Sequence, residues 1–226
     1  MPKYLLIFEK SESVRWLGHL DILRTFERAI RRAGLPVAFS TGFNPRERIA
    51  FASALSTGVT AGAEPAVLEL TDTVDPMGLR DGLNTTLPPG IRISECREIP
   101  ETGSRDLLNS YDCADYEVVC ACPPATEAAE VESAIHALLE RPHWEVVRER
   151  QGRSKCVDIR PYVFGLALSP GSLTANRLTL AMTLGIGEGG NAKPPELVAL
   201  LAEAITGLVL RRSHRLRLLC ATPVAD

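Results

Sequence analysis

Apolar and polar positions in the first half of the chain follow two periods in turn. Period-two or continuous apolar runs predict strands at residues 4–10, 36–40, 66–71 and 91–99. Helical spacing predicts a short helix at 75–88 and a longer one at 18–34, whose shared face is formed by Leu20, Leu23, Phe26, Ala29 and Ile30. The predicted order of elements is βαββαβ.

The second half repeats this order. Strands are expected at 115–122, 143–150, 177–185 and 214–221, and helices at 125–141 and 194–205. A further strand-like segment lies around 155–168 and has no counterpart in the first half. Residues 100–113 are polar and unpatterned, as is typical of a linker.

A repeated βαββαβ order predicts an α+β protein made of two tandem ferredoxin-like sandwiches, each with helices on one face of an antiparallel sheet. We expect an N-terminal domain over residues 1–100 and a C-terminal domain over residues 114–222. The length of 226 residues suits two domains of about 100 residues.

The distribution of charge changes the picture given by its total. The formal net charge is −3, which by itself does not indicate a nucleic-acid-binding protein. Residues 1–60, however, carry nine basic and five acidic side chains, whereas residues 61–142 carry five and sixteen, and residues 143–226 carry eleven and seven. A basic surface can therefore exist on an acidic protein.

Several classes of protein are disfavoured. No apolar run reaches the roughly 18 residues that span a bilayer, so we expect a cytoplasmic protein without a membrane partner. The six cysteines lack metal-ligand spacing, so neither a metal nor another cofactor is expected. No known catalytic motif occurs and the four histidines are scattered, which favours a non-enzymatic role without excluding an enzyme.

The stretch "STGFNPRERIAFASALSTG", residues 40–58, is the first candidate site. Phe43 and Asn44 lie beside Arg46 and Arg48, and an aromatic ring among arginines is typical of single-stranded nucleic-acid binding. The small residues around Ser53 would let a ligand approach the backbone. The alternative is a loop whose Phe43 packs on its own domain.

The start of the first helix is the second candidate. Arg15 precedes it, His19 and Asp21 lie in its first turn, and Arg24 and Arg28 form a row with Arg31 at helical spacing. His19 and Asp21 could act as acid and base, or bind an anion. The alternative is a capping role for the pair and a solvated face for the arginines.

Two segments of the second half are weaker candidates. Asp158 and Arg160 in "VDIRP" share a strand face and form either a polar anchor for a ligand or a surface ion pair. The glycine-rich "GIGEGGNAKPPEL" precedes a helix and fits neither the P-loop nor the dinucleotide fingerprint, so a flexible connector is favoured over a phosphate site.

Three stretches together resemble a bacterial family: "RWLGHLDILRTFERAIRRAGLPVAFSTGFNPRERIAFASALSTGV", "VDIRP" and "GGNAKPPEL". The resemblance is to the uncharacterised radical SAM-linked domain, which is found beside or fused to radical SAM proteins. It implies a radical SAM iron–sulfur protein as partner, because this chain lacks the cysteines to bind such a cluster.

Three functions remain open at this point. The leading hypothesis is a non-catalytic RNA-binding accessory module that presents tRNA or rRNA to the radical SAM partner. The second is an RNA-acting enzyme that uses His19 and Asp21. The third is a module that docks on the radical SAM protein without nucleic acid.

Overall fold

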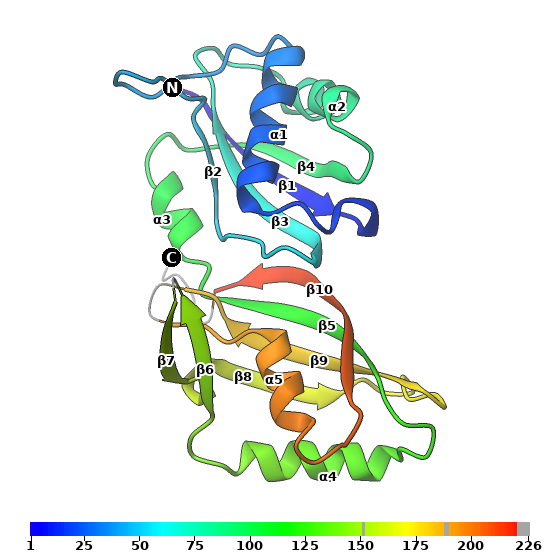
Figure 1. Ribbon diagram of the computed structural model, residues 1–226. Helices are drawn as coiled ribbons and strands as arrows, with labels where there is room; N and C mark the ends of the chain where they lie inside the picture. The colour runs from blue at the N-terminus through cyan, green and yellow to red at the C-terminus, as the bar shows by residue number, and fades with distance from the viewer. Residues whose placement is uncertain (151, 188–189, 221–226) are drawn as a thin grey trace. The chain divides into compact units, whose positions relative to one another are not determined.

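The computed structural model describes residues 1–150, 152–187 and 190–220, and divides them into two compact units (Figure 1). The first unit comprises Met1–Tyr111 and Cys220, and the second comprises Asp112–Leu219. Helices and antiparallel sheet strands occur in both units, so the predicted α+β class is confirmed. No helix among the described residues is both long and apolar enough to cross a bilayer.

The first unit contains a four-stranded antiparallel sheet with the order β4-β1-β3-β2. The register of its two central strands pairs Tyr4 with Leu68 and Leu6 with Ala66. Its elements in chain order are β1 (Lys3–Lys10), the 3-10 turn η1 (Glu12–Val14), α1 (His19–Arg32), β2 (Ile49–Phe51), β3 (Val59–Glu69), α2 (Pro76–Thr86), β4 (Ile91–Ile99) and α3 (Ser104–Asn109).

Strand alternation divides the side chains of this sheet between two layers. Tyr4, Leu6 and Phe8 of β1 are buried in the main core with α1 and α2, where Phe8 and Phe26 meet edge-to-face at 5.1 Å between ring centroids. Leu5 of β1 points to the opposite face and packs in a second, smaller cluster with Leu108 of α3. The main helices therefore cover one face, and α3 covers part of the other.

The second unit has a four-stranded antiparallel sheet with the order β10-β5-β9-β8. Helices α4 and α5 contact β8, β10 and each other. The elements are β5 (Cys113–Ala121), α4 (Ala128–Leu139), β6 (Glu145–Arg150), β7 (Arg153–Asp158), the 3-10 turn η2 (Arg160–Tyr162), β8 (Val163–Leu168), β9 (Arg177–Gly185), α5 (Pro194–Leu201) and β10 (Val209–Leu219).

The second strand of each sheet differs from the prediction. In the first unit, residues 36–40 form only isolated bridges, and β2 after the candidate loop pairs with β3 instead. In the second unit, β6 pairs with β7 in a separate two-stranded sheet, and β8 takes the place next to β9. The order βαββαβ is thus present in the first unit, whereas the second carries the β6–β7 hairpin as an insertion.

Two further expectations are corrected by the structure. Leu20 was expected in the core, but its side chain is 62% exposed because the first turn of α1 presents Ile22 inward instead. The segment 100–113, expected to be an unstructured linker, contains α3, whose Leu108 is buried against the sheet.

Candidate functional site

The loop after the first helix is a hairpin that projects from the first unit. Phe39 and Glu47 form a bridge at its base, and the amide of Ser40 donates to the carbonyl of Arg46 at 2.8 Å. Gly42 has φ 134°, a conformation that side chains rarely adopt, and so lets the chain turn before Phe43. The Phe43 ring is fully exposed, so the alternative in which it packs on its own domain does not apply.

An ion pair fixes the hairpin to helix α1. The guanidinium of Arg31 forms a two-pronged contact with the carboxylate of Glu47, with Nη2 and Oε2 3.0 Å apart. The Glu47 side chain is buried, and its hydrogen bond from Arg31 lowers the pKa of the carboxyl. Because a buried acceptor is costly to leave unpaired, this contact holds the 39–47 hairpin beside the last turn of α1.

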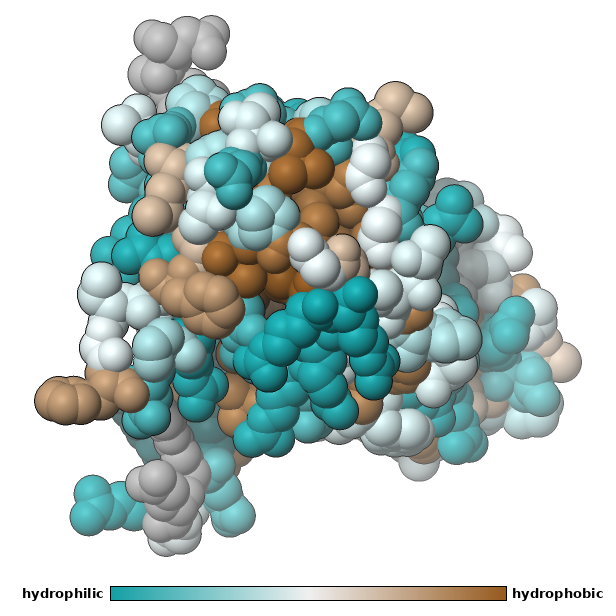
Figure 2. All heavy atoms as spheres, turned by 90° about the horizontal axis from the view of Figure 1, so that it is seen from above, coloured by the Kyte–Doolittle hydropathy of each residue, from teal (hydrophilic) through white to brown (hydrophobic). Residues whose placement is uncertain are grey.

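The arginines of α1 form one exposed row that leads to this hairpin. Arg24 is 65% exposed, and Arg28, one turn later, is exposed and donates from Nε to the carbonyl of Arg24 at 3.1 Å. Arg31 continues the row and contacts the hairpin. Figure 2 shows a block of strongly hydrophilic side chains beside apolar ones on the face viewed from above. Because Arg31 belongs to the row and contacts Glu47 of the hairpin, the row and the hairpin adjoin and form one surface.

Arg46 adds a further charge to this surface. It is exposed one residue from the base of the hairpin, and its guanidinium makes no hydrogen bond or ion pair among the described residues. Asn44 is likewise exposed beside Phe43. We call Arg24, Arg28, Phe43, Asn44 and Arg46 the hairpin–helix surface.

The start of α1 does not form an acid–base pair. The Asp21 carboxylate accepts a hydrogen bond from the Gly18 amide at 3.1 Å and caps the helix. The His19 and Phe51 rings pack edge-to-face with their centroids 5.6 Å apart. The described residues show no hydrogen bond between His19 and Asp21, so the two serve helix capping and packing.

Sequence reasoning missed an exposed aromatic ring that lies just before α1 in the chain. Trp16 is 67% exposed, and the Arg15 guanidinium stacks on it at 4.5 Å from the ring centroid. Fully buried Lys10 supports this turn by donating to the carbonyls of Arg15 and Leu17 at 2.9 and 2.8 Å. Trp16 precedes the helical pattern, so periodicity gave no signal for its exposure.

The predicted residues of the first unit do not share one cavity. Arg15 and His19 lie at the start of α1, whereas the hairpin contacts its last turn, and a helix of 14 residues is about 21 Å long. Arg48 follows the hairpin but points toward the face that carries α3, where it pairs with Glu69 at 2.9 Å. Ser53 is half-buried just beyond β2.

Asp158 ends β7 and Arg160 begins the turn η2 in the second unit, so the predicted shared strand face is wrong, and the two residues form a local anchor instead. The Asp158 carboxylate bonds His143 Nδ1 at 2.7 Å and accepts from the amides of Trp144 and Arg160 at 2.8 and 3.0 Å. These contacts, that of His143 foremost, lower the pKa of Asp158 to about 2. The Arg160 guanidinium lies 5.3 Å from the ring centroid of Trp144. The pair therefore holds the base of the β6–β7 hairpin.

The glycine-rich segment is packed against the same region. Gly190 has φ 142°, and an added Cβ would lie 1.9 Å from the ring of Tyr162. Arg148 of β6 donates to the carbonyl of Asn191 and forms an ion pair with Glu196 at 2.7 Å. The described part of the segment is thus a packed turn and not the flexible connector that its glycines predict; Glu188 and Gly189 lie outside the described residues.

In the described part of the chain, no group of three or more His, Cys, Asp or Glu side chains is arranged so that it could hold a metal ion. Burial raises the pKa of the Cys120 thiol to about 12, which keeps it protonated at neutral pH.

Comparison with known proteins identifies a family and a fold. The model of the family described as "Uncharacterized protein conserved in bacteria (DUF2344)" matches residues 3–194. No curated protein matches the chain.

Three solved structures are similar over 95% of this chain. They are a Cbf5-Nop10-Gar1 complex (TM-score 0.56, 8% identity), an H/ACA RNP bound to a substrate RNA containing 2'-deoxyuridine (0.52, 9%) and an archaeal box H/ACA sRNP Nop10-Cbf5 complex (0.51, 10%). The chain spans 48%, 47% and 47% of those chains, about half their length, and at these identities the likeness is one of fold alone.

Proposed function

The chain belongs to the bacterial DUF2344 family, and from that premise we propose that it is a non-catalytic module that binds single-stranded RNA through the hairpin–helix surface. The observation that carries the proposal is the fully exposed Phe43, held next to a row of arginines by the buried Glu47. An aromatic ring that no core requires is available for stacking on a base.

The charges of the surface support this assignment. Arg24 and Arg28 are exposed, and Arg46 makes no ion pair among the described residues. Arginine binds phosphate oxygens through a planar fork of donors and also stacks on bases. One stacking ring with three such side chains matches the combination used for sequence-tolerant binding of single strands.

The finer features of fold and partner are part of the proposal. We regard both units as ferredoxin-like sandwiches, supported by the corresponding strand orders β4-β1-β3-β2 and β10-β5-β9-β8. The similar structures include an H/ACA RNP bound to a substrate RNA and a complex of a box H/ACA sRNP, which agrees with an RNA-associated fold. The resemblance of the sequence to the radical SAM-linked domain supports a radical SAM iron–sulfur protein as the recipient of the bound tRNA or rRNA.

Crosslinking tests the proposal directly. Cells that express the tagged full-length chain are irradiated, and the RNA bound to it is sequenced while the crosslinked residue is identified by mass spectrometry. We expect crosslinks at Phe43 or its neighbours and their loss in Phe43→Ala. If no RNA is recovered above the level of an untagged control, or if the crosslinks lie only in the second unit, the assignment is wrong.

A further inference from the structure

A second surface of the first unit lies on the sheet face that carries α3, away from α1 and the Arg row. A groove of about 590 Å³ runs there between β2, β3 and α3. Ala50, Val67 and Leu108 form its apolar part, and Lys3, Arg48, Arg105 and Glu69 are its charged lining. The hairpin–helix surface uses none of these residues.

The outer edge of β2 opens beside the groove. The carbonyl of Arg48 and the amide of Ala52 bond to β3 at 3.0 and 3.1 Å, so alternate residues Ile49 and Phe51 direct their backbone groups away from β3. Within the described part of this unit, β2 pairs with β3 alone. The carbonyl of Ile49 and the amide and carbonyl of Phe51 thus offer a template for one more strand.

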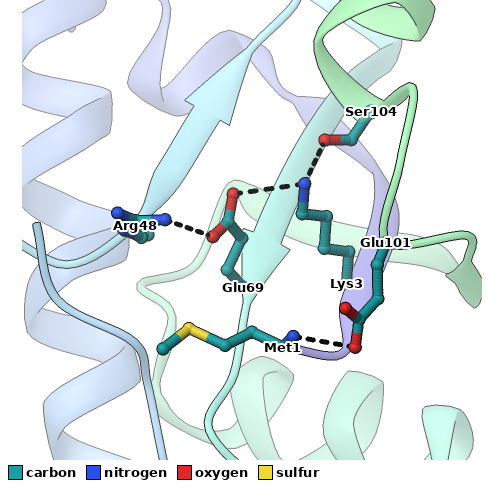
Figure 3. Close-up of polar contacts among 6 residues, drawn as sticks. All are labelled: Met1, Lys3, Arg48, Glu69, Glu101 and Ser104. Carbon is teal, nitrogen blue, oxygen red and sulfur yellow. Dashed lines mark hydrogen bonds and ion pairs between the residues drawn. The ribbon is translucent and has the colours of Figure 1, made fainter.

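The charged lining of the groove is held in place and is net positive. Glu69 bridges Arg48 at 2.9 Å and Lys3 at 3.6 Å, and Lys3 Nζ also donates to Ser104 Oγ at 2.8 Å (Figure 3). Arg105 on α3 is exposed and makes no hydrogen bond or ion pair among the described residues. Three cations face one carboxylate, which leaves two positive charges in excess, and Arg105 is the cation without an ion-pair partner among the described residues.

We propose that this groove and the edge of β2 bind an extended acidic segment of a partner protein, which adds to the sheet as a further strand. Strand addition supplies main-chain hydrogen bonds, and side chains at alternate positions then point into the groove. The lining selects an acidic residue opposite Arg105 and, two positions along, an aliphatic residue opposite Val67 and Leu108.

A designed peptide distinguishes an acidic strand from other ligands of the groove. A fluorescein-labelled peptide, Glu-Thr-Val-Thr-Glu-Thr-Val-Thr, places acidic and aliphatic side chains alternately on one face of a strand. It is titrated against the full chain beside a peptide with Lys in place of Glu and beside labelled oligouridine. We expect Arg105→Glu to weaken binding of the acidic peptide roughly tenfold, because a charge-assisted contact is replaced by repulsion. The same substitution should leave binding of the other two ligands unchanged.

Two further measurements keep the test specific. Arg92→Glu on β4, the opposite edge of the sheet, is the matched control and should leave peptide binding unchanged. Amide exchange of Phe51 should slow when the acidic peptide is bound, which charge attraction alone does not produce. The proposal is wrong if the lysine peptide binds equally well, if Phe51 exchange is unaffected, or if Arg105→Glu weakens oligouridine binding instead, which would assign the groove to RNA.

Discussion

Replacing Arg46 by alanine should change the salt dependence of RNA binding by a defined amount. Each phosphate contact on a single strand contributes about −0.7 to the slope of log affinity against log salt. With Arg24, Arg28 and Arg46 in contact, the slope is about −2.1, so affinity falls about 18-fold between about 50 and about 200 mM KCl. Arg46→Ala removes one contact and should reduce that fall to about 7-fold.

Fluorescence anisotropy of labelled oligouridine, roughly twelve nucleotides long, measures these slopes. Two controls make the result specific. Arg92→Ala on β4 removes the same charge at the far edge of the sheet, and Arg48→Ala removes an arginine that is already paired with Glu69. In both variants the affinity should fall about 18-fold over this salt range, as in the wild type. Equal slopes for Arg46→Ala and wild type, or equal effects of Arg46→Ala and Arg48→Ala, would refute the assignment of the phosphate contacts.

Three other substitutions test separate parts of the structure. Phe43→Ala should weaken RNA binding by roughly 1–3 kcal/mol with an unchanged salt slope, and Phe43→Trp should restore it, as measured in the same titrations. Gly190→Ala should destabilise the chain by about 1–3 kcal/mol, because its Cβ would overlap the Tyr162 ring, whereas Gly187→Ala should leave the thermal midpoint unchanged. Because the pKa of Asp158 is lowered from 3.8 to about 2, the wild type should lose stability as the pH falls between those values, and chemical unfolding of Asp158→Asn should lack that loss.

The helices could be predicted because their signals are local. The α1 face formed by Phe26, Ala29 and Ile30 is buried as its spacing predicts, and the cap of α2 at Asp75 accepts from the Gly78 amide at 2.8 Å. Leu20 shows where this reasoning ends. Its spacing from Leu23 suggested the apolar face, but the buried stripe of α1 begins at Ile22 and continues through Phe26, so the Leu20 side chain remains in solvent.

The strands that complete each sheet could not be predicted, because pairing and not local pattern selects them. β2 has only three residues, too few for a visible alternation, and it is a strand because β3 extends beside it. β6 shows a strand pattern yet, in the part of the chain that the structure describes, it pairs with β7 and not with the main sheet, while the glycine-containing β8 joins that sheet. Contacts distant in sequence decide both cases.

The candidate site could be predicted only in part, because it also depends on contacts between residues distant in sequence. The composition of the 39–47 hairpin indicated arginines around an aromatic ring, but the exposure of Phe43 depends on how the base of the hairpin is held. That role belongs to Glu47 and Arg31, whose partnership over 16 positions has no local signal. Arg48 was grouped with Arg46 by proximity in sequence, and the structure directs it to Glu69 instead.

The separation of Arg46 from Arg48 also separates the two proposed surfaces. Glu47 points to α1, where it holds Arg31, and the next residue, Arg48, points to the face of α3, where it holds Glu69. Successive residues of an extended chain face opposite sides, so one short segment contributes to two surfaces. Arg46 and Arg105 share no hydrogen-bond or ion-pair partner among the described residues, so we expect loss of RNA binding in Arg46→Ala and loss of peptide binding in Arg105→Glu to be independent observations. RNA binding and strand addition can therefore each be refuted while the other stands.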